Sequence, residues 1–179
     1  MRVISGSARG TKLSTLEGQD IRPTLDRVKE SIFNMIAFDL PGADVLDLFC
    51  GSGSLGIESL SRGAGHATFV DNHPPALSVT RQNLAKTHLE ARASLVLSDS
   101  VSFLKTTEKQ FDIILLDPPY DSPLYALALA EIARRKLLTP DGQIVLECDK
   151  IITPPFETNG FSITRDKNYG RVKILIMKV

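Results

Sequence analysis

The stretch Val45-Leu46-Asp47-Leu48-Phe49-Cys50-Gly51-Ser52-Gly53-Ser54-Leu55-Gly56 decides how this chain folds. An apolar run ends in a turn with three glycines, and residues compatible with a helix follow it. This order predicts a buried strand, a turn whose backbone can closely approach a ligand, and then a helix. The turn alone does not identify the ligand, because nicotinamide enzymes, flavin enzymes and purely structural turns share it.

The same alternation of strand and helix continues along the chain. Apolar runs rich in β-branched residues predict parallel strands at 44–50, 67–71, 94–98, 111–117 and 143–147. Crossover helices are expected at 55–62, 75–88 and 124–136, with a short one at 100–105. We therefore predict an α/β fold with helices on both faces of a mainly parallel sheet.

The two ends of the chain add to this core. Residues 161–165 and 172–179 predict a hairpin with its turn at 166–170, which completes a seven-stranded sheet with one antiparallel strand. Apolar residues at helical spacing from Leu25 to Ile36 predict a leading helix with Thr24 as its N-cap. Ahead of it, residues 2–4 and 11–13 predict a small β-hairpin.

The length of 179 residues suits a single domain, with residues 1–22 as an N-terminal extension. No apolar run approaches the ~20 residues of a membrane-spanning helix, and no secretory signal begins the chain, so we expect a cytoplasmic protein. Cys50 and Cys148 are expected to be buried apolar residues. The histidines have no companions at ligand spacing, which predicts no metal, and we expect a monomer.

Charge is unevenly distributed along the chain, although the formal net charge is zero. Residues 1–30 carry +2, residues 31–160 carry −6 and residues 160–179 carry +4. Basic ends are typical of nucleic-acid contacts, but chance clustering of surface charge explains them equally well. Charge therefore leaves the partner open.

Three carboxylates stand at the ends of successive predicted strands, Asp47, Asp71 and Asp99. Asp47 lies inside a buried strand end, where a ligand ammonium group would compensate its charge. Asp71 can accept hydrogen bonds from ribose hydroxyls, although capping of the next helix explains it as well, and Asp99 can meet an adenine edge. The loop after Asp47 resembles motif I of the class I, Rossmann-like methyltransferases, which bind S-adenosylmethionine. The predicted cofactor residues are Asp47, Phe49, Gly51, Ser52, Gly53, Asp71, Asn72, Asp99 and Ser100.

A second motif, Asp117-Pro118-Pro119-Tyr120, ends the strand at 111–117. An exocyclic base nitrogen attacks a methyl group poorly until hydrogen-bond acceptors orient it, and the Asp117 carboxylate and Pro118 carbonyl can supply such acceptors. Tyr120 can stack on a base that has left its helix. The structural alternative is that the prolines simply end the strand and Tyr120 covers the core. Together with the glycine turn, the motif favours amino methylation, with Asp117, Pro118 and Tyr120 as catalytic residues.

Two N-terminal stretches extend the resemblance to a particular family. They are Arg2-Val3-Ile4-Ser5-Gly6 with Arg9-Gly10-Thr11-Lys12-Leu13, and the run from Arg22-Pro23-Thr24 to Phe33-Asn34. With the two motifs above, they resemble the RsmD family of bacterial 16S rRNA guanine-N2 methyltransferases over nearly the whole chain.

The resemblance implies methyl transfer to the 2-amino group of one guanine in 16S rRNA, within the small ribosomal subunit. By position, Arg9, Lys12, Arg22 and Arg27 are the candidate RNA contacts. Ser7 and Thr11 stand where relatives commonly carry basic residues, and Asp71 stands where a glutamate is common. Two alternatives stay open: an amino methyltransferase acting on adenine N6 or on a protein glutamine, and a non-catalytic RNA-binding or assembly factor with the same fold.

Overall fold

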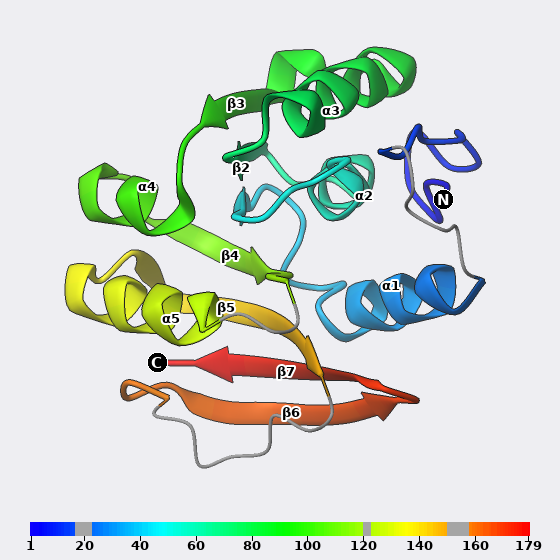
Figure 1. Cartoon of the computed structure of the whole chain (residues 1–179). Coiled ribbons are helices and arrows are strands. Elements are labelled where there is room, and N and C mark those ends of the chain that lie inside the picture. Colours follow the sequence, from blue (N-terminus) through cyan, green and yellow to red (C-terminus); the bar gives the residue numbers. More distant parts are fainter. Residues whose placement is uncertain (17–22, 120–122, 150–157) are drawn as a thin grey trace.

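A computed structural model describes residues 1–16, 23–119, 123–149 and 158–179 of the chain. Seven strands form one sheet in the order β3-β2-β1-β4-β5-β7-β6 (Figure 1). The strands are β1 (Asp44–Asp47), β2 (His66–Asp71), β3 (Ala93–Leu97), β4 (Phe111–Leu116), β5 (Leu138–Asp149), β6 (Ser162–Tyr169) and β7 (Val172–Lys178). The first five are parallel, and β7 runs antiparallel to both of its neighbours. The predicted mainly parallel seven-stranded sheet is confirmed.

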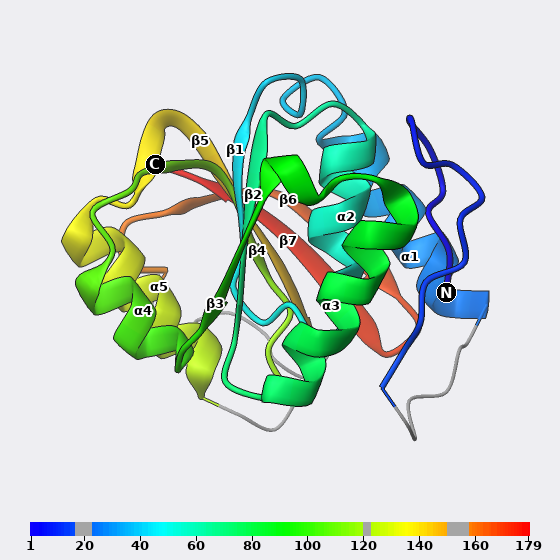
Figure 2. The same cartoon turned by 90° about the horizontal axis from the view of Figure 1, so that it is seen from above.

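Within the described ranges, five α-helices cover the two faces of the sheet, as Figure 2 shows from above. They are α1 (Pro23–Met35), α2 (Ser54–Ser61), α3 (Pro74–Thr87), α4 (Ser100–Thr106) and α5 (Leu124–Arg135), with a 3-10 turn, η1, at Glu90–Arg92. Helices α1, α2 and α3 contribute to one hydrophobic cluster, and α4 and α5 contribute to the other. Both faces of the central strands β1, β2, β4, β5 and β7 are therefore largely buried, which explains why these strands are mostly apolar on both sides, whereas the edge strand β6 is polar and mostly exposed.

The N-terminal segment packs on the α1–α3 face. Residues Val3, Ala8 and Leu13 are buried in that cluster. The amide of Ser7 donates to the carbonyl of Ser61 at 2.8 Å, and a Cβ on Gly6 would lie 1.8 Å from the same oxygen. Glycine is required at this position because the two backbones touch and its φ is +84°.

Several predicted boundaries differ from the structure. The N-terminal hairpin pairs antiparallel, but through a single bridge between Arg2 and Lys12 rather than through two strands. The predicted turn at 166–170 was wrong in extent, because β6 continues to Tyr169 opposite Val172. Helix α1 includes Pro23 and Thr24, so Thr24 lies within the helix rather than at its N-cap.

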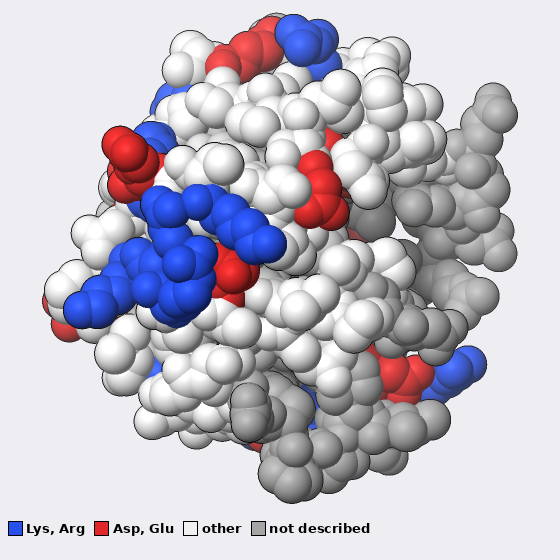
Figure 3. All heavy atoms as spheres, turned by 60° about the vertical axis from the view of Figure 1, so that its left-hand side comes forward, with Lys and Arg blue, Asp and Glu red and all other residues white. Residues whose placement is uncertain are grey.

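Basic side chains also gather away from the chain ends. Figure 3 shows the side of the molecule on which α4 and α5 lie, with a cluster of Lys and Arg on its surface. Helix α4 has Lys105 in its last turn, α5 has Arg134 and Arg135, and Arg135 donates to the carbonyl of Lys105. Cations near helix C-termini are favoured by the helix dipole. This cluster lies within the segment whose net charge is negative.

Among the described residues, no helix combines the length and the apolar character that spanning a membrane requires.

Candidate active site

The glycine turn lies at the carboxyl end of β1, where the strand order changes direction between β1 and β4. Gly51 and Gly53 have φ values of +52° and +77°, which glycine adopts without strain. Beyond the turn, a Cβ on Gly56 would meet the Phe69 ring at 2.3 Å, so this glycine lets α2 pack against β2. The position is the one at which open α/β sheets bind ligands.

Two carboxylates hold this turn in place. Asp47 Oδ2 accepts from the amide of Gly56 at 2.9 Å. Asp71 Oδ2 accepts from the amide of Gly51 at 2.9 Å, while its Oδ1 accepts from the amide of His73. Each carboxylate oxygen has a second lone pair, so Asp71 can still accept from ligand hydroxyls. Both acids therefore shape the turn and remain able to bind a ligand.

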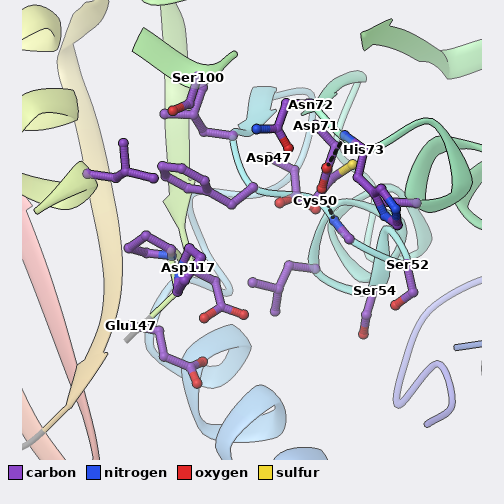
Figure 4. A pocket seen from close by; sticks show the side chains of 18 of the residues that line it. Asp47, Cys50, Ser52, Ser54, Asp71, Asn72, His73, Ser100, Asp117 and Glu147 are labelled. Carbon is purple, nitrogen blue, oxygen red and sulfur yellow. Dashed lines mark hydrogen bonds between the residues drawn. The ribbon is translucent and has the colours of Figure 1, made fainter. Parts of the chain in front are cut away.

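A cavity of about 490 Å³ opens above the turn (Figure 4). This volume suits a drug-sized ligand. Its lining includes eight of the nine predicted cofactor residues and the predicted catalytic residues Asp117 and Pro118. The eight are Asp47, Phe49, Gly51, Ser52, Asp71, Asn72, Asp99 and Ser100. The tertiary structure thus brings both sequence motifs to one cavity.

Two predicted site residues stand apart from this lining. Gly53 is not among the lining residues; it is the N-cap of α2, and a Cβ there would lie 2.6 Å from the Thr80 side chain. Its role in the turn is therefore conformational. Tyr120, the predicted stacking platform, lies outside the described residues.

Asp99 has a structural role as well as a place in the cavity. Its carboxylate accepts from the amide of Ser102 at 2.9 Å and so caps α4. The alternative expectation for Asp71 was that it caps the helix that follows. In the structure His73 is the N-cap of α3, and Asp71 accepts a hydrogen bond from the amide of His73.

The cavity also contains an acid that the sequence analysis did not select, Glu147. It lies near the carboxyl end of β5, beside Asp117, and Figure 4 shows both carboxylates together at one side of the opening. Its position at the end of the predicted strand at 143–147 was a signal available from the sequence. A second residue missed, Lys29 of α1, lines the cavity and donates to the carbonyl of Arg2 and to Ser54.

The buried acids are electrostatically costly in the free protein. Burial raises the pKa of Asp47 to about 7, and the charge of Asp71 adds to this while the Gly56 hydrogen bond opposes it. Burial also raises the pKa of Asp117 well above its usual value, with further contributions from the Glu147 and Asp47 charges. A bound cation would stabilise the charged form of both carboxylates and so lower their pKa values. S-adenosylmethionine carries a sulfonium and an ammonium group, so the residues present fit this cofactor.

The described residues contain no group of histidine, cysteine and carboxylate side chains that could hold a metal ion. Cys50 and Cys148 are both buried and free. Burial raises the pKa of Cys50 far above the neutral range and that of Cys148 to about 11. Neither thiol is therefore a nucleophile at neutral pH.

Two of the four predicted RNA contacts line a second, separate groove. Arg9 and Arg27 line a groove of about 470 Å³ together with Arg2, and Asp26 and Glu30 are also part of its wall. Lys12 is exposed and pairs with Arg2 through the backbone bridge. Arg22 lies outside the described residues. In the C-terminal hairpin, Arg171 and Lys173 lie near Asp149 and Asp166, at 3.6 and 3.4 Å, which reduces the charge they present.

The fold and this cavity define a methyltransferase of the class I type. The chain belongs to the family described as "Conserved hypothetical protein 95", which matches residues 1–178, and the predicted membership of the RsmD family is confirmed.

Individual relatives agree with this assignment. The chain is 41% identical to "Putative rRNA methyltransferase YlbH" of Bacillus subtilis over 99% of its own length and 98% of the relative. It is 34% identical to the Haemophilus influenzae protein "Ribosomal RNA small subunit methyltransferase D", over 96% of this chain and 90% of that protein. The solved structure "Putative methyltransferase yhhF" from Escherichia coli has a TM-score of 0.89 at 30% identity, covering 99% of this chain and 96% of that one. Solved chains that share the fold at under 25% identity include a methyltransferase with bound SAH.

Proposed function

We propose that this protein transfers the methyl group of S-adenosylmethionine to the exocyclic N2 amino group of a guanine in small-subunit ribosomal RNA. One observation carries the proposal: Asp117 and Pro118 border the same cavity as the glycine turn and its two carboxylates. Acceptors for an amino group and a pocket for a cationic methyl donor are thus adjacent. The names of the relatives supply the RNA class.

Each cofactor contact has a chemical reason. With S-adenosylmethionine bound, Asp47 would compensate the ammonium of the methionine part and the backbone of Phe49, Gly51 and Ser52 would surround that part. Asp71 with Asn72 would accept hydrogen bonds from the ribose hydroxyls. Asp99 and Ser100 lie where an adenine edge would meet the start of α4. The cofactor supplies an electrophilic methyl group bonded to a positive sulfur.

The protein's part in the reaction is positioning and charge compensation. Asp117 accepts one N–H of the amino group and the carbonyl of Pro118 accepts the other, which aims the nitrogen lone pair at the methyl carbon. Methyl transfer to this nitrogen would leave the cofactor as a neutral thioether, because the electrons of the C–S bond would stay on the sulfur. The nitrogen then releases a proton, and the Asp117 carboxylate is the acceptor nearest to it in this arrangement.

The direct test uses labelled S-adenosylmethionine and small ribosomal subunits from cells that lack this gene. We expect label in N2-methylguanosine after nucleoside analysis. Label in N6-methyladenosine would show that the substrate is wrong. Failure of the folded protein to bind S-adenosylmethionine in calorimetry would instead favour a non-catalytic RNA-binding role.

Cofactor affinity should depend on pH through Asp47. Because burial raises the pKa of this acid to about 7, it is largely protonated below that pH and cannot compensate an ammonium. We expect the association constant to rise with pH up to about 7, by up to about 10-fold per unit, and then to level off. Calorimetry from pH 5.5 to 8.5 measures this.

Asp47→Asn is the control for this titration. The ligand's own amino group titrates with both proteins, so the difference between the two profiles reports Asp47. A variant profile parallel to that of the wild type would contradict the assignment. Without cofactor, the free energy of unfolding should fall as the pH rises from about 4 to about 7, because the folded protein holds this proton more tightly than the unfolded chain does.

We propose that the groove lined by Arg9 and Arg27 contacts RNA phosphates, with Lys12 and Arg22 extending the contact. Replacing Arg9 and Arg27 together by alanine should weaken binding to small-subunit RNA and reduce the slope of log K against log salt by about 2. Filter binding at several salt concentrations measures both quantities.

The matched control removes two charges from the opposite side of the molecule, with Lys105→Ala and Arg134→Ala in α4 and α5 (Figures 1 and 2). This variant should lose less affinity than the groove variant. Equal losses would show that RNA attraction is spread over the surface and would contradict a contact specific to the groove.

A further inference from the structure

Glu147 is a buried acid for which the methyl-transfer scheme above has no role. Its side chain is 7% exposed and borders the cavity from β5. The strand is central, with β4 on one side and β7 on the other. Its side chain therefore reaches the cavity from the strand next to the one that ends just before Asp117.

The strand register places Glu147 level with Asp117. Leu115 pairs with Val145 and Leu116 with Leu146, so the next residues along the two parallel strands are Asp117 and Glu147. Leu115 and Val145 face the α1–α3 cluster, and side chains two residues further along a strand point to the same face. The two carboxylates are therefore neighbours on one face, in agreement with Figure 4 and with the effect of Glu147 on Asp117.

Two adjacent acceptors match the edge of guanine. Guanine presents two neighbouring donors, N1–H and the N2 amino group. Adenine presents an amino group beside an N1 lone pair. The N1–H of guanine can donate a hydrogen bond to a neighbouring carboxylate. Adenine has a lone pair at N1 instead, so its N1 and the carboxylate repel each other and neither has a hydrogen-bond partner.

We infer that Glu147 is a specificity-determining residue, which accepts the N1–H of the target guanine while Asp117 accepts an N–H of the amino group. This inference rests on the proposed function and adds the group that selects guanine over adenine. The positive sulfonium in the same cavity compensates the paired acids, so that both can act as acceptors once the cofactor is bound.

The test combines one substitution with one base analogue. 2-Aminopurine keeps the amino group at C2 but has a lone pair at N1 and no N1–H. Subunits are reconstituted with guanosine or with 2-aminopurine at the modified position, and kcat/KM is measured for wild type and for Glu147→Gln. The glutamine amide can donate to the N1 lone pair but keeps the size of the side chain.

We expect wild type to favour guanosine by about 10- to 100-fold. In Glu147→Gln, the amide oxygen can still accept the N1–H of guanosine, and the amide NH2 can now donate to the N1 lone pair of 2-aminopurine. Transfer to 2-aminopurine should therefore rise relative to transfer to guanosine, so that the preference disappears. Glu147→Asp keeps the charge, and it should be slower but still favour guanosine. This second variant also provides a test if the glutamine protein does not fold.

Two results would overturn the inference. Equal loss on both bases would show that Glu147 acts only on structure or on the charge of Asp117. Loss of S-adenosylmethionine binding by folded Glu147→Gln would place the residue in the cofactor site. Failure of wild type to methylate guanosine N2 at all would instead contradict the proposed function, so the two failures are distinguishable.

Discussion

Asp117→Ala should lower the rate of methyl transfer by about 10³-fold while leaving the affinity for S-adenosylmethionine within a few-fold of wild type. Removing one preorganised hydrogen-bond partner of a reacting group costs about 10²- to 10³-fold. Loss of the proton acceptor adds to this. The variant should stay folded, because burial raises the pKa of Asp117 and its removal relieves a buried acid. Single-turnover transfer of labelled methyl and calorimetry measure the two effects.

Asp117→Asn is the informative companion. An amide oxygen can still accept one N–H of the amino group but cannot take up the released proton. We therefore expect an activity between those of wild type and alanine. If Asp117→Ala lost cofactor binding together with transfer, Asp117 would belong to the cofactor site and its catalytic assignment would fail.

Glu58→Ala should strongly destabilise the α1–α3 layer. Glu58 is fully buried in α2, and its carboxylate accepts from the amides of Ile4 and Ser5 at 2.8 and 3.0 Å. The same carboxylate pairs with Arg62 at 2.8 Å and with Lys29 at 3.4 Å. Removing one member of a buried ion pair costs about 3–5 kcal/mol, because the remaining charge is left without its partner. This is a large part of a typical stability of about 5–15 kcal/mol.

Urea denaturation measures this loss, and two variants control it. Glu131→Ala removes a carboxylate that pairs with Arg134 at the surface of α5 and should cause no measurable change. Lys29→Met added to Glu58→Ala should recover part of the stability, because it removes the buried ammonium that has lost the carboxylate paired with it. Equal stability of Glu58→Ala and Glu131→Ala would contradict a stabilising role for the network. The expected functional consequence is weaker RNA binding, since Glu58 holds the segment that carries Arg2 and Arg9.

Most of the fold was predictable because apolar strands and glycine turns are local signals. The glycine turn and the Asp117 motif each follow a buried run, and parallel strands bring such carboxyl ends to one edge. The turn at 166–170 was less predictable, because polar residues such as Asp166 and Asn168 favour turns locally. Their pairing with Leu175 and Lys173 keeps them in β6, since tertiary pairing overrides local preference.

The class of fold, the glycine turn with Asp47 and Asp71, and the acid-proline-proline stretch were predictable from the chain alone, because each depends on residues close together in sequence. That Asp117 and Glu147 are neighbours became evident only in three dimensions, because strand register joins residues distant in sequence. The spatial distribution of charge also follows from the tertiary structure. Glu58 and Lys29 form a buried ion pair, and basic residues of α4 and α5 cluster on the surface although their segment of the chain has a negative net charge. Interactions between charges depend on distance and burial, which a sum along the sequence does not contain.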